Sequence, residues 1–201
     1  MNQLTDYIKV YENQIDEDLC DKLIDYFESS ENVQKIDNNK YPSYSELNIS
    51  NDFSNTELKE LHESVLECVL KVKDLYIEDL SIVEFPNTYS LEQFRIKRYL
   101  NDNYEEFETH VDVSSHSSAK RFLGFFFYLN DVEEGGETGF PHLDYEVKPK
   151  KGSVLVFPPL WLYKHYGKMP VSGNKYIVGS YLHYVDYEIG KENTEESDLQ
   201  Q

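Results

Sequence analysis

The chain has 201 residues, of which 39% are hydrophobic and 14% aromatic, enough to form one domain with a substantial core. A net charge of -19 excludes partners bound mainly through phosphate contacts, so we expect no nucleic-acid ligand. The surface charge favours a basic or neutral partner instead.

Cysteine content and hydropathy limit the cellular setting. The sequence has two cysteines, Cys20 and Cys68, too few for the disulfide framework of a small secreted domain. Its longest apolar runs, such as Leu123 to Leu129, are far shorter than the roughly 20 residues needed to cross a bilayer. The first residues also lack the pattern of a secretory signal. We therefore expect a cytoplasmic protein with no membrane segment.

Two helices are predicted in the first half of the chain. Ile15 to Phe27 carries apolar residues on one helical face, and Asp16 is a suitable N-cap. Glu57 to Leu80 repeats this pattern over a longer stretch. Ser29 to Phe53 lies between them, is rich in Asn, Ser, Asp and Tyr, and contains Pro42. This composition predicts a long loop.

From Leu91 onward the pattern changes to that of strands. FRIKRYL alternates, and RFLGFFFYLN, GSVLVFP and KYIVGSYLHY are short apolar runs separated by turn residues. Helices followed by many short strands predict an α+β arrangement in which helices pack on an antiparallel sandwich or barrel. Residues 186–201 are acidic and polar, and we expect a frayed tail there.

A possible metal site lies in the segment ETHVDVSS. In extended chain, His110 and Asp112 point to the same side because strand side chains alternate. A third imidazole would complete a 2-His-1-carboxylate triad, which leaves iron coordination positions open. His165 is the candidate, and His142 is the rival. Taken alone, an H-x-D pair is more often a pair of surface polar residues.

Further motifs follow in a fixed order around this pair. Arg98-Tyr99 precedes it, YLNDVEEGGETGFP and VKPKKGSVLVFP follow, and the series ends with His165, Gly167, PV, Gly173 and Lys175. This ordered set resembles the prolyl 4-hydroxylase family of Fe(II)/2-oxoglutarate-dependent dioxygenases. The resemblance covers Phe94 to Tyr184 directly.

The resemblance implies a double-stranded β-helix, a jelly-roll or cupin-like core, with supporting N-terminal helices. Residues 1–185 would form a single dioxygenase domain, with helical support in 1–85 and the jelly-roll core in 86–185. His110, Asp112 and His165 would bind Fe(II). Ascorbate would serve as the reductant.

The resemblance also assigns the cosubstrate site. Lys175 would pair with the distal carboxylate of 2-oxoglutarate, and Tyr99 would donate a hydrogen bond to the same end. A lysine within the apolar strand KYIVGSY needs such a buried anion, although a lysine near a turn can also extend to water. Trp161 and Tyr181 are candidates for substrate contact, and core packing is the alternative for Trp161.

The implied activity is hydroxylation of a prolyl residue in a peptide or protein, with decarboxylation of 2-oxoglutarate to succinate and CO2. The same chemistry on a free amino acid, a small metabolite or another side chain remains an alternative. A non-catalytic jelly-roll binding protein and a zinc hydrolase are further alternatives. The sequence does not indicate an oligomeric state.

Overall fold

The computed structural model describes residues 3–37, 43–102 and 104–185. The helical elements are η1 (Leu4–Tyr7), α1 (Glu17–Ser29), α2 (Thr56–Asp79) and η2 (Trp161–Tyr163). The strands before the H-x-D pair are β1 (Lys9–Tyr11), β2 (Gln34–Asp37), β3 (Ser43–Asn48), β4 (Tyr89–Leu91), β5 (Arg95–Tyr99) and β6 (Phe107–His110). Those after it are β7 (Arg121–Tyr128), β8 (Thr138–Phe140), β9 (Tyr145–Val147), β10 (Val154–Phe157), β11 (His165–Gly167) and β12 (Lys175–Tyr184).

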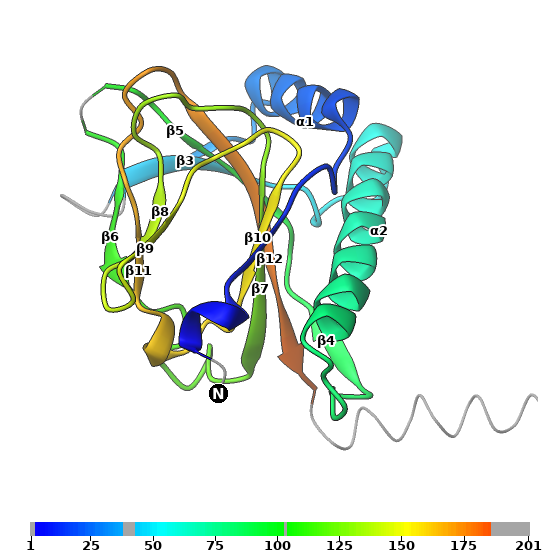
Figure 1. Cartoon of the computed structure of the whole chain (residues 1–201). Coiled ribbons are helices and arrows are strands. Elements are labelled where there is room, and N and C mark those ends of the chain that lie inside the picture. The colour runs from blue at the N-terminus through cyan, green and yellow to red at the C-terminus, as the bar shows by residue number, and fades with distance from the viewer. Residues whose placement is uncertain (1–2, 38–42, 103, 186–201) are drawn as a thin grey trace, which may run out of the picture.

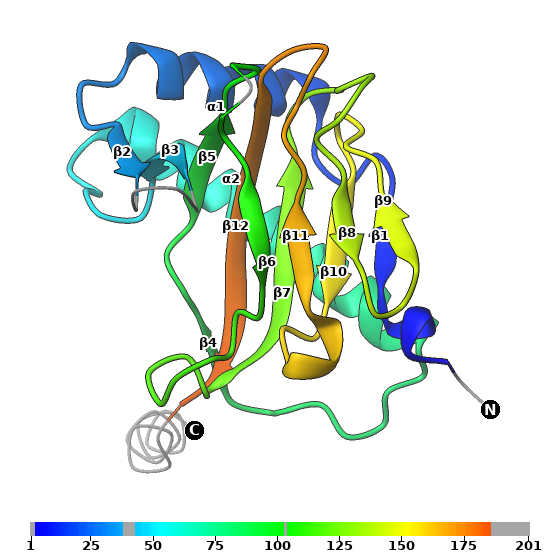
Figure 2. The same cartoon turned by 90° about the vertical axis from the view of Figure 1, so that its left-hand side faces the viewer.

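Two antiparallel sheets face each other. Over the described residues, the larger has eight strands in the order β1-β10-β7-β12-β5-β3-β2, with β4 paired to β12. The smaller has four strands in the order β6-β11-β8-β9. Figure 1 shows the two helices on the outer face of the large sheet, and Figure 2 shows the small sheet in front of its inner face. This is the jelly-roll core with supporting helices that the sequence predicts.

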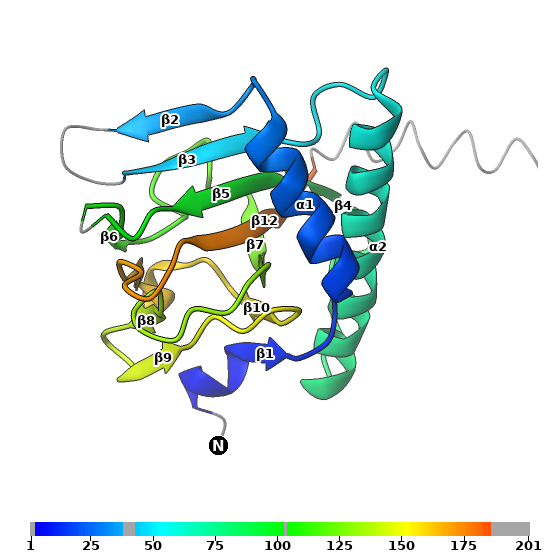
Figure 3. The same ribbon diagram turned by 90° about the horizontal axis from the view of Figure 1, so that it is seen from above.

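The helices form where the apolar spacing predicts them. In α1, Cys20, Leu23 and Phe27 are buried on one face. Asp16 occupies the N-cap position, but its side chain makes no capping hydrogen bond. Asn55 caps α2, since its side-chain oxygen accepts a hydrogen bond from the Leu58 amide at 3.1 Å. Figure 3 shows α1 and α2 side by side over the large sheet.

Side chains alternate between the two faces of the large sheet and so contribute to two separate hydrophobic cores. In β7, Phe125 and Phe127 face the helices, whereas Phe126 and Tyr128 face the small sheet. Val178 and Ile177 of β12 divide in the same way. One side of the large sheet therefore supports the helices, and the other side, between the two sheets, is available for a site.

The prediction of a long loop at Ser29 to Phe53 is wrong. This stretch contains β2 and β3, and β3 pairs with β5 within the large sheet. The prediction from hydrophobic periodicity failed because β3, SYSELN, is polar in sequence yet buried along most of its length. Its side chains pair with groups from distant strands, such as Glu46 with Arg95, and these partners cannot be identified from local sequence.

The N-terminal part also contributes to the large sheet. Strand β1 pairs with β10, so Lys9 to Tyr11 extends the jelly roll beyond the region expected to supply it. The predicted tail, 186–201, lies outside the described residues. Among the described helices, none combines the length and apolarity that a membrane span requires.

Candidate metal centre and cavity

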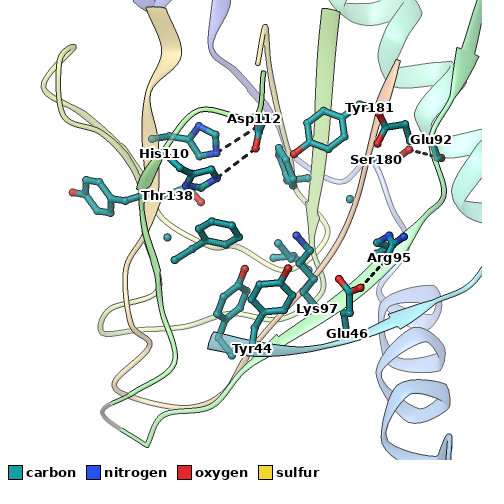
Figure 4. A pocket seen from close by; sticks show the side chains of 18 of the residues that line it. Tyr44, Glu46, Glu92, Arg95, Lys97, His110, Asp112, Thr138, Ser180 and Tyr181 are labelled. Carbon is teal, nitrogen blue, oxygen red and sulfur yellow. Dashed lines mark hydrogen bonds and ion pairs between the residues drawn. The ribbon is translucent and has the colours of Figure 1, made fainter. Parts of the chain in front are cut away.

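Three polar side chains converge between the sheets. His110 ends β6 and His165 begins β11, and the two residues are paired directly across the small sheet. Asp112 follows β6 by two residues. Its Oδ1 lies 3.4 Å from His110 Nε2 and its Oδ2 lies 3.6 Å from His165 Nε2. One ligand atom from each of the three lies within 4.8 Å of the others, and Figure 4 shows two of them, His110 and Asp112, at one side of the cavity.

Both imidazoles are oriented by backbone carbonyls. His110 Nδ1 donates to Glu108 O at 2.7 Å, and His165 Nδ1 donates to Tyr163 O at 3.0 Å. In this tautomer each Nε2 has a free lone pair, and both Nε2 atoms point toward Asp112. Histidines that bind a metal are usually oriented in this way, with the other ring nitrogen donating to a carbonyl or carboxylate.

The third group, Asp112, is suited to a cation. Its Oδ2 is buried and accepts no hydrogen bond. Such an orphaned carboxylate oxygen is costly unless a positive charge lies beside it. Two imidazole nitrogens and a carboxylate form the donor set of non-haem iron, so the residues fit Fe(II).

The protonation of the triad favours metal binding. Burial alone would raise the pKa of Asp112, but hydrogen bonding and charge from His110 and His165, with a contribution from Tyr181, lower it overall. Burial lowers the pKa of His165, although Asp112 opposes this effect. An ionised carboxylate and a neutral imidazole are the forms that coordinate a metal.

Arg121 positions Asp112 and was missed by the sequence reasoning. Its guanidinium pairs with both oxygens of Glu92, at 2.7 and 2.8 Å, and Nη1 donates to the Asp112 backbone carbonyl at 3.1 Å. It also lies over the Tyr181 ring, 4.1 Å from the centroid. The strand pattern shows Arg121 only as the first residue of β7, so no local signal identified this role.

A cavity of about 380 Å³ extends from the triad across the inner face of the large sheet. Its volume is within the range typical of small-molecule sites. Strand β5 contributes Arg95, Lys97 and Tyr99 to the lining. The polar face of FRIKRYL therefore faces the cavity. Tyr181 lines it as well.

The proposed cosubstrate residues gather at one end. Lys175 is buried, and its Nζ donates to Gly136 O at 2.6 Å. The rings of Tyr99 and Tyr128 lie 5.7 and 5.5 Å from Nζ, and both tyrosines line the cavity, with Lys175 behind them. Burial lowers the pKa of Lys175 to about 8, and the charge of Glu137 opposes this effect.

Tyr128 and Thr138 are further polar groups at this end that sequence reasoning did not select. The Tyr128 hydroxyl donates to Thr138 Oγ1 at 2.9 Å, and both residues line the cavity. The YLN and GGET motifs contain them, so the signal was present. Gly135 and Gly136, with φ of 75° and 74°, form the turn that leads into β8 and Thr138.

Two other candidates lie elsewhere. Trp161 is 72% exposed and does not line the cavity. His142 is exposed and is absent from the cluster of metal-binding side chains among the described residues. The structure therefore brings His165, not His142, to His110 and Asp112.

Comparison with known proteins agrees with this geometry. Residues 94–183 match the model of the 2OG-Fe(II) oxygenase superfamily. The chain is 37% identical over 86 residues to probable prolyl 4-hydroxylase 9 of Arabidopsis thaliana, a match that covers 33% of this chain and 29% of that protein. The chain spans less than half the length of the curated relatives that it matches.

Solved structures share the fold. The viral collagen prolyl hydroxylase of Paramecium Bursaria Chlorella virus-1, in a 2OG complex, has a TM-score of 0.68 at 23% identity, covering 89% of this chain and 97% of that one. A prolyl hydroxylase of Trichoplax adhaerens, in complex with a hypoxia inducible factor peptide fragment, has a TM-score of 0.69 at 16% identity, covering 89% and 84%. The motifs, the jelly roll and the match of residues 94–183 to the 2OG-Fe(II) oxygenase superfamily therefore agree, and the curated relatives that the chain resembles are called prolyl 4-hydroxylases.

Proposed function

We propose that this protein is an Fe(II)- and 2-oxoglutarate-dependent dioxygenase that hydroxylates a prolyl residue in a peptide or protein. The observation that carries the proposal is the meeting of His110, Asp112 and His165 at a cavity, together with a buried lysine, Lys175, beside two tyrosines that line the same cavity. Two imidazoles and one carboxylate leave coordination positions free for the cosubstrate and dioxygen.

Each group has a separate task. His110, Asp112 and His165 would hold Fe(II), and the bound metal would supply the oxidative chemistry that inserts oxygen into a C–H bond. Lys175 would neutralise the distal carboxylate of 2-oxoglutarate. To do so, its ammonium would turn from the Gly136 carbonyl toward the cavity, between Tyr99 and Tyr128.

The tyrosine of the cosubstrate site is better assigned to Tyr128 than to Tyr99. Tyr128 already points its hydroxyl at Thr138, a cavity residue, and both groups could bond a carboxylate oxygen. The hydroxyl of Tyr99 has no comparable polar contact in the described part of the chain, so its ring would serve as a wall beside Lys175.

The proposal of a prolyl substrate is supported by the names of the similar proteins. The curated relatives are called prolyl 4-hydroxylases, and one solved structure contains a peptide fragment. An extended peptide could cross the open side of the cavity.

We also propose ascorbate as the reductant and the cytoplasm as the compartment. The free state of Cys20 and Cys68 agrees with a reducing compartment.

The test is succinate formation by the purified protein with Fe(II), ascorbate, oxygen and 2-oxoglutarate, with and without a proline-rich peptide. We expect peptide-stimulated turnover that His110→Ala abolishes, with a mass increase of one oxygen on the peptide. Absence of Fe(II) binding together with absence of succinate would reject the oxygenase in favour of a binding protein.

The cosubstrate assignment has its own test. Lys175→Met should weaken 2-oxoglutarate binding to the Fe(II) protein under anaerobic conditions by about tenfold or more, because a charge-assisted contact is worth about 1.5–3 kcal/mol. Tyr128→Phe should weaken it less, and Tyr99→Phe should leave it unchanged. Equal affinity in Lys175→Met and the parent would remove Lys175 from the site.

A further inference from the structure

A second lysine faces the cavity, and the cosubstrate does not account for it. Lys97 lies on β5 between Arg95 and Tyr99, and these three residues line the cavity together. In the sheet, Lys97 is paired with Ile177 and Tyr99 is paired with Lys175. Lys97 is therefore two residues, or about 6.6 Å, along the strand from the end assigned to 2-oxoglutarate. Figure 4 shows its side chain pointing into the cavity.

Lys97 differs from the other cavity-lining cations in having no carboxylate partner among the described residues. Arg95 pairs with Glu46, and Arg121 pairs with Glu92. The Lys97 ammonium instead lies over aromatic faces, 4.8 Å from the Tyr44 ring centroid and 5.6 Å from that of Phe107. Cation–π contacts compensate only part of the loss of hydration, so a bound anion would stabilise this charge.

The position of Lys97 places such an anion close to the reaction centre. Phe107, one of the two rings beneath the ammonium, is stacked on the metal ligand candidate His110 with 3.9 Å between ring centroids. Burial lowers the pKa of Lys97, and the negative charges of Glu46 and, to a smaller extent, Asp112 oppose this effect. The Phe107 ring thus contacts both the Lys97 ammonium and His110, so an anion on Lys97 would lie on the same side of the cavity as the triad.

The charge of the site leaves room for one further negative group. Asp112 and the two charges of 2-oxoglutarate would balance Fe(II) and Lys175, because Arg95 and Arg121 are already paired. Lys97 adds one positive charge to this neutral set. A carboxylate carries the single negative charge that would restore balance.

We propose that Lys97 forms a carboxylate-binding subsite for the substrate, so that the enzyme prefers molecules that carry a carboxylate close to the carbon that is hydroxylated. The inference rests on the proposed function and defines its substrate class. The carboxylate could be the α-carboxylate of free or C-terminal proline, or the side chain of an acidic residue beside an internal proline. This local preference differs from that of the acidic surface, which favours basic partners.

The experiment measures binding by titration calorimetry under anaerobic conditions, with Fe(II) and saturating 2-oxoglutarate. The probes are a short peptide ending in proline as the free acid and as the amide, free L-proline, and two matched peptides with internal Pro-Asp or Pro-Asn. The variants are Lys97→Met, Lys97→Arg and the control Lys71→Met. Lys71 is an exposed lysine of α2, on the other side of the large sheet, and its substitution changes the net charge equally.

We expect the parent to bind at least one carboxylate probe about tenfold or more tightly than its neutral counterpart, or to bind free L-proline with a comparable dependence on Lys97. Lys97→Met should remove this preference, Lys97→Arg should keep most of it, and Lys71→Met should not change it. The probe that shows the effect identifies the source of the carboxylate.

Several results would overturn the inference. One is the absence of any carboxylate preference or Lys97-dependent proline binding in the parent. Another is a preference that survives in Lys97→Met. A third is a tenfold loss of 2-oxoglutarate affinity in Lys97→Met, measured without substrate, which would assign Lys97 to the cosubstrate. Failure of the proposed function would be distinguishable from failure of this inference. In that case the parent would form no Fe(II)-dependent succinate with any of the probes, whatever its binding preference.

Discussion

Replacing Arg121 with glutamine should weaken metal binding although Arg121 is not a ligand. The change removes a bidentate pair with Glu92 and the hydrogen bond to the Asp112 carbonyl. Hydrogen bonds to charged groups are worth about 1.5–3 kcal/mol when buried. The side chains of Arg121 and Glu92 are 24% and 26% exposed, so we expect a loss of about 1–2 kcal/mol in the free energy of unfolding.

The effect on the metal should exceed what this loss of stability explains. Groups that hold metal ligands in place typically change affinity by about 10- to 100-fold, and Arg121 fixes the backbone from which the Asp112 side chain extends. We expect the Fe(II) dissociation constant of Arg121→Gln, measured by anaerobic titration of folded protein, to rise about tenfold.

Arg98→Gln is the matched control. Arg98 Nη1 contacts both oxygens of Glu28, at 2.9 and 3.0 Å, and this pair joins β5 to α1 on the side of the sheet away from the cavity. Its removal should lower thermal stability to a similar extent and leave the Fe(II) affinity of the folded protein unchanged. Equal Fe(II) affinity in both variants would refute the positioning role of Arg121.

Three further predictions follow from the site and its supports. His165→Ala should abolish stoichiometric Fe(II) binding whereas His142→Ala should not, and the reverse result would show that the third ligand is wrongly assigned. Because burial lowers the pKa of Lys175 from 10.5 to about 8, the folded chain binds its proton less tightly than the unfolded chain does. Without 2-oxoglutarate, the buried charge of Lys175 therefore destabilises the fold fully below pH 8, and this destabilisation is relieved as the pH rises toward 10.5. The free energy of unfolding of the parent should accordingly rise relative to that of Lys175→Met between these pH values. A constant difference between the two proteins would contradict the lowered pKa of Lys175. Gly179→Ala places a Cβ 2.7 Å from Phe126 Cδ1 and should cost about 1–3 kcal/mol, whereas Gly173→Ala has open space; equal melting temperatures for the two variants would contradict this packing argument.

The sequence predicted the two helices and the long strands because their burial is periodic. Leu61, Val65, Val69 and Val72 of α2 are buried as their spacing indicates. The same argument failed for β3, whose buried serines and Glu46 look like loop residues until the strands beside them are known. Local pattern detects apolar burial but not polar burial, since the partners that make polar burial tolerable lie far away in the chain.

The sequence by itself predicted the candidate metal ligands and Lys175, because the H-x-D pair and the ordered motifs that follow it contain these groups. Only the tertiary structure decided how the remaining groups are used. The pairing of β6 with β11 selects His165 over His142, and the pairing of β5 with β12 turns Lys97 toward the cavity. Pairing of Arg95 and Arg121 with Glu46 and Glu92 then leaves Lys97 as the cation available to an anion among the cavity-lining residues described. Charge balance depends on distances between side chains, and the register of distant strands sets those distances.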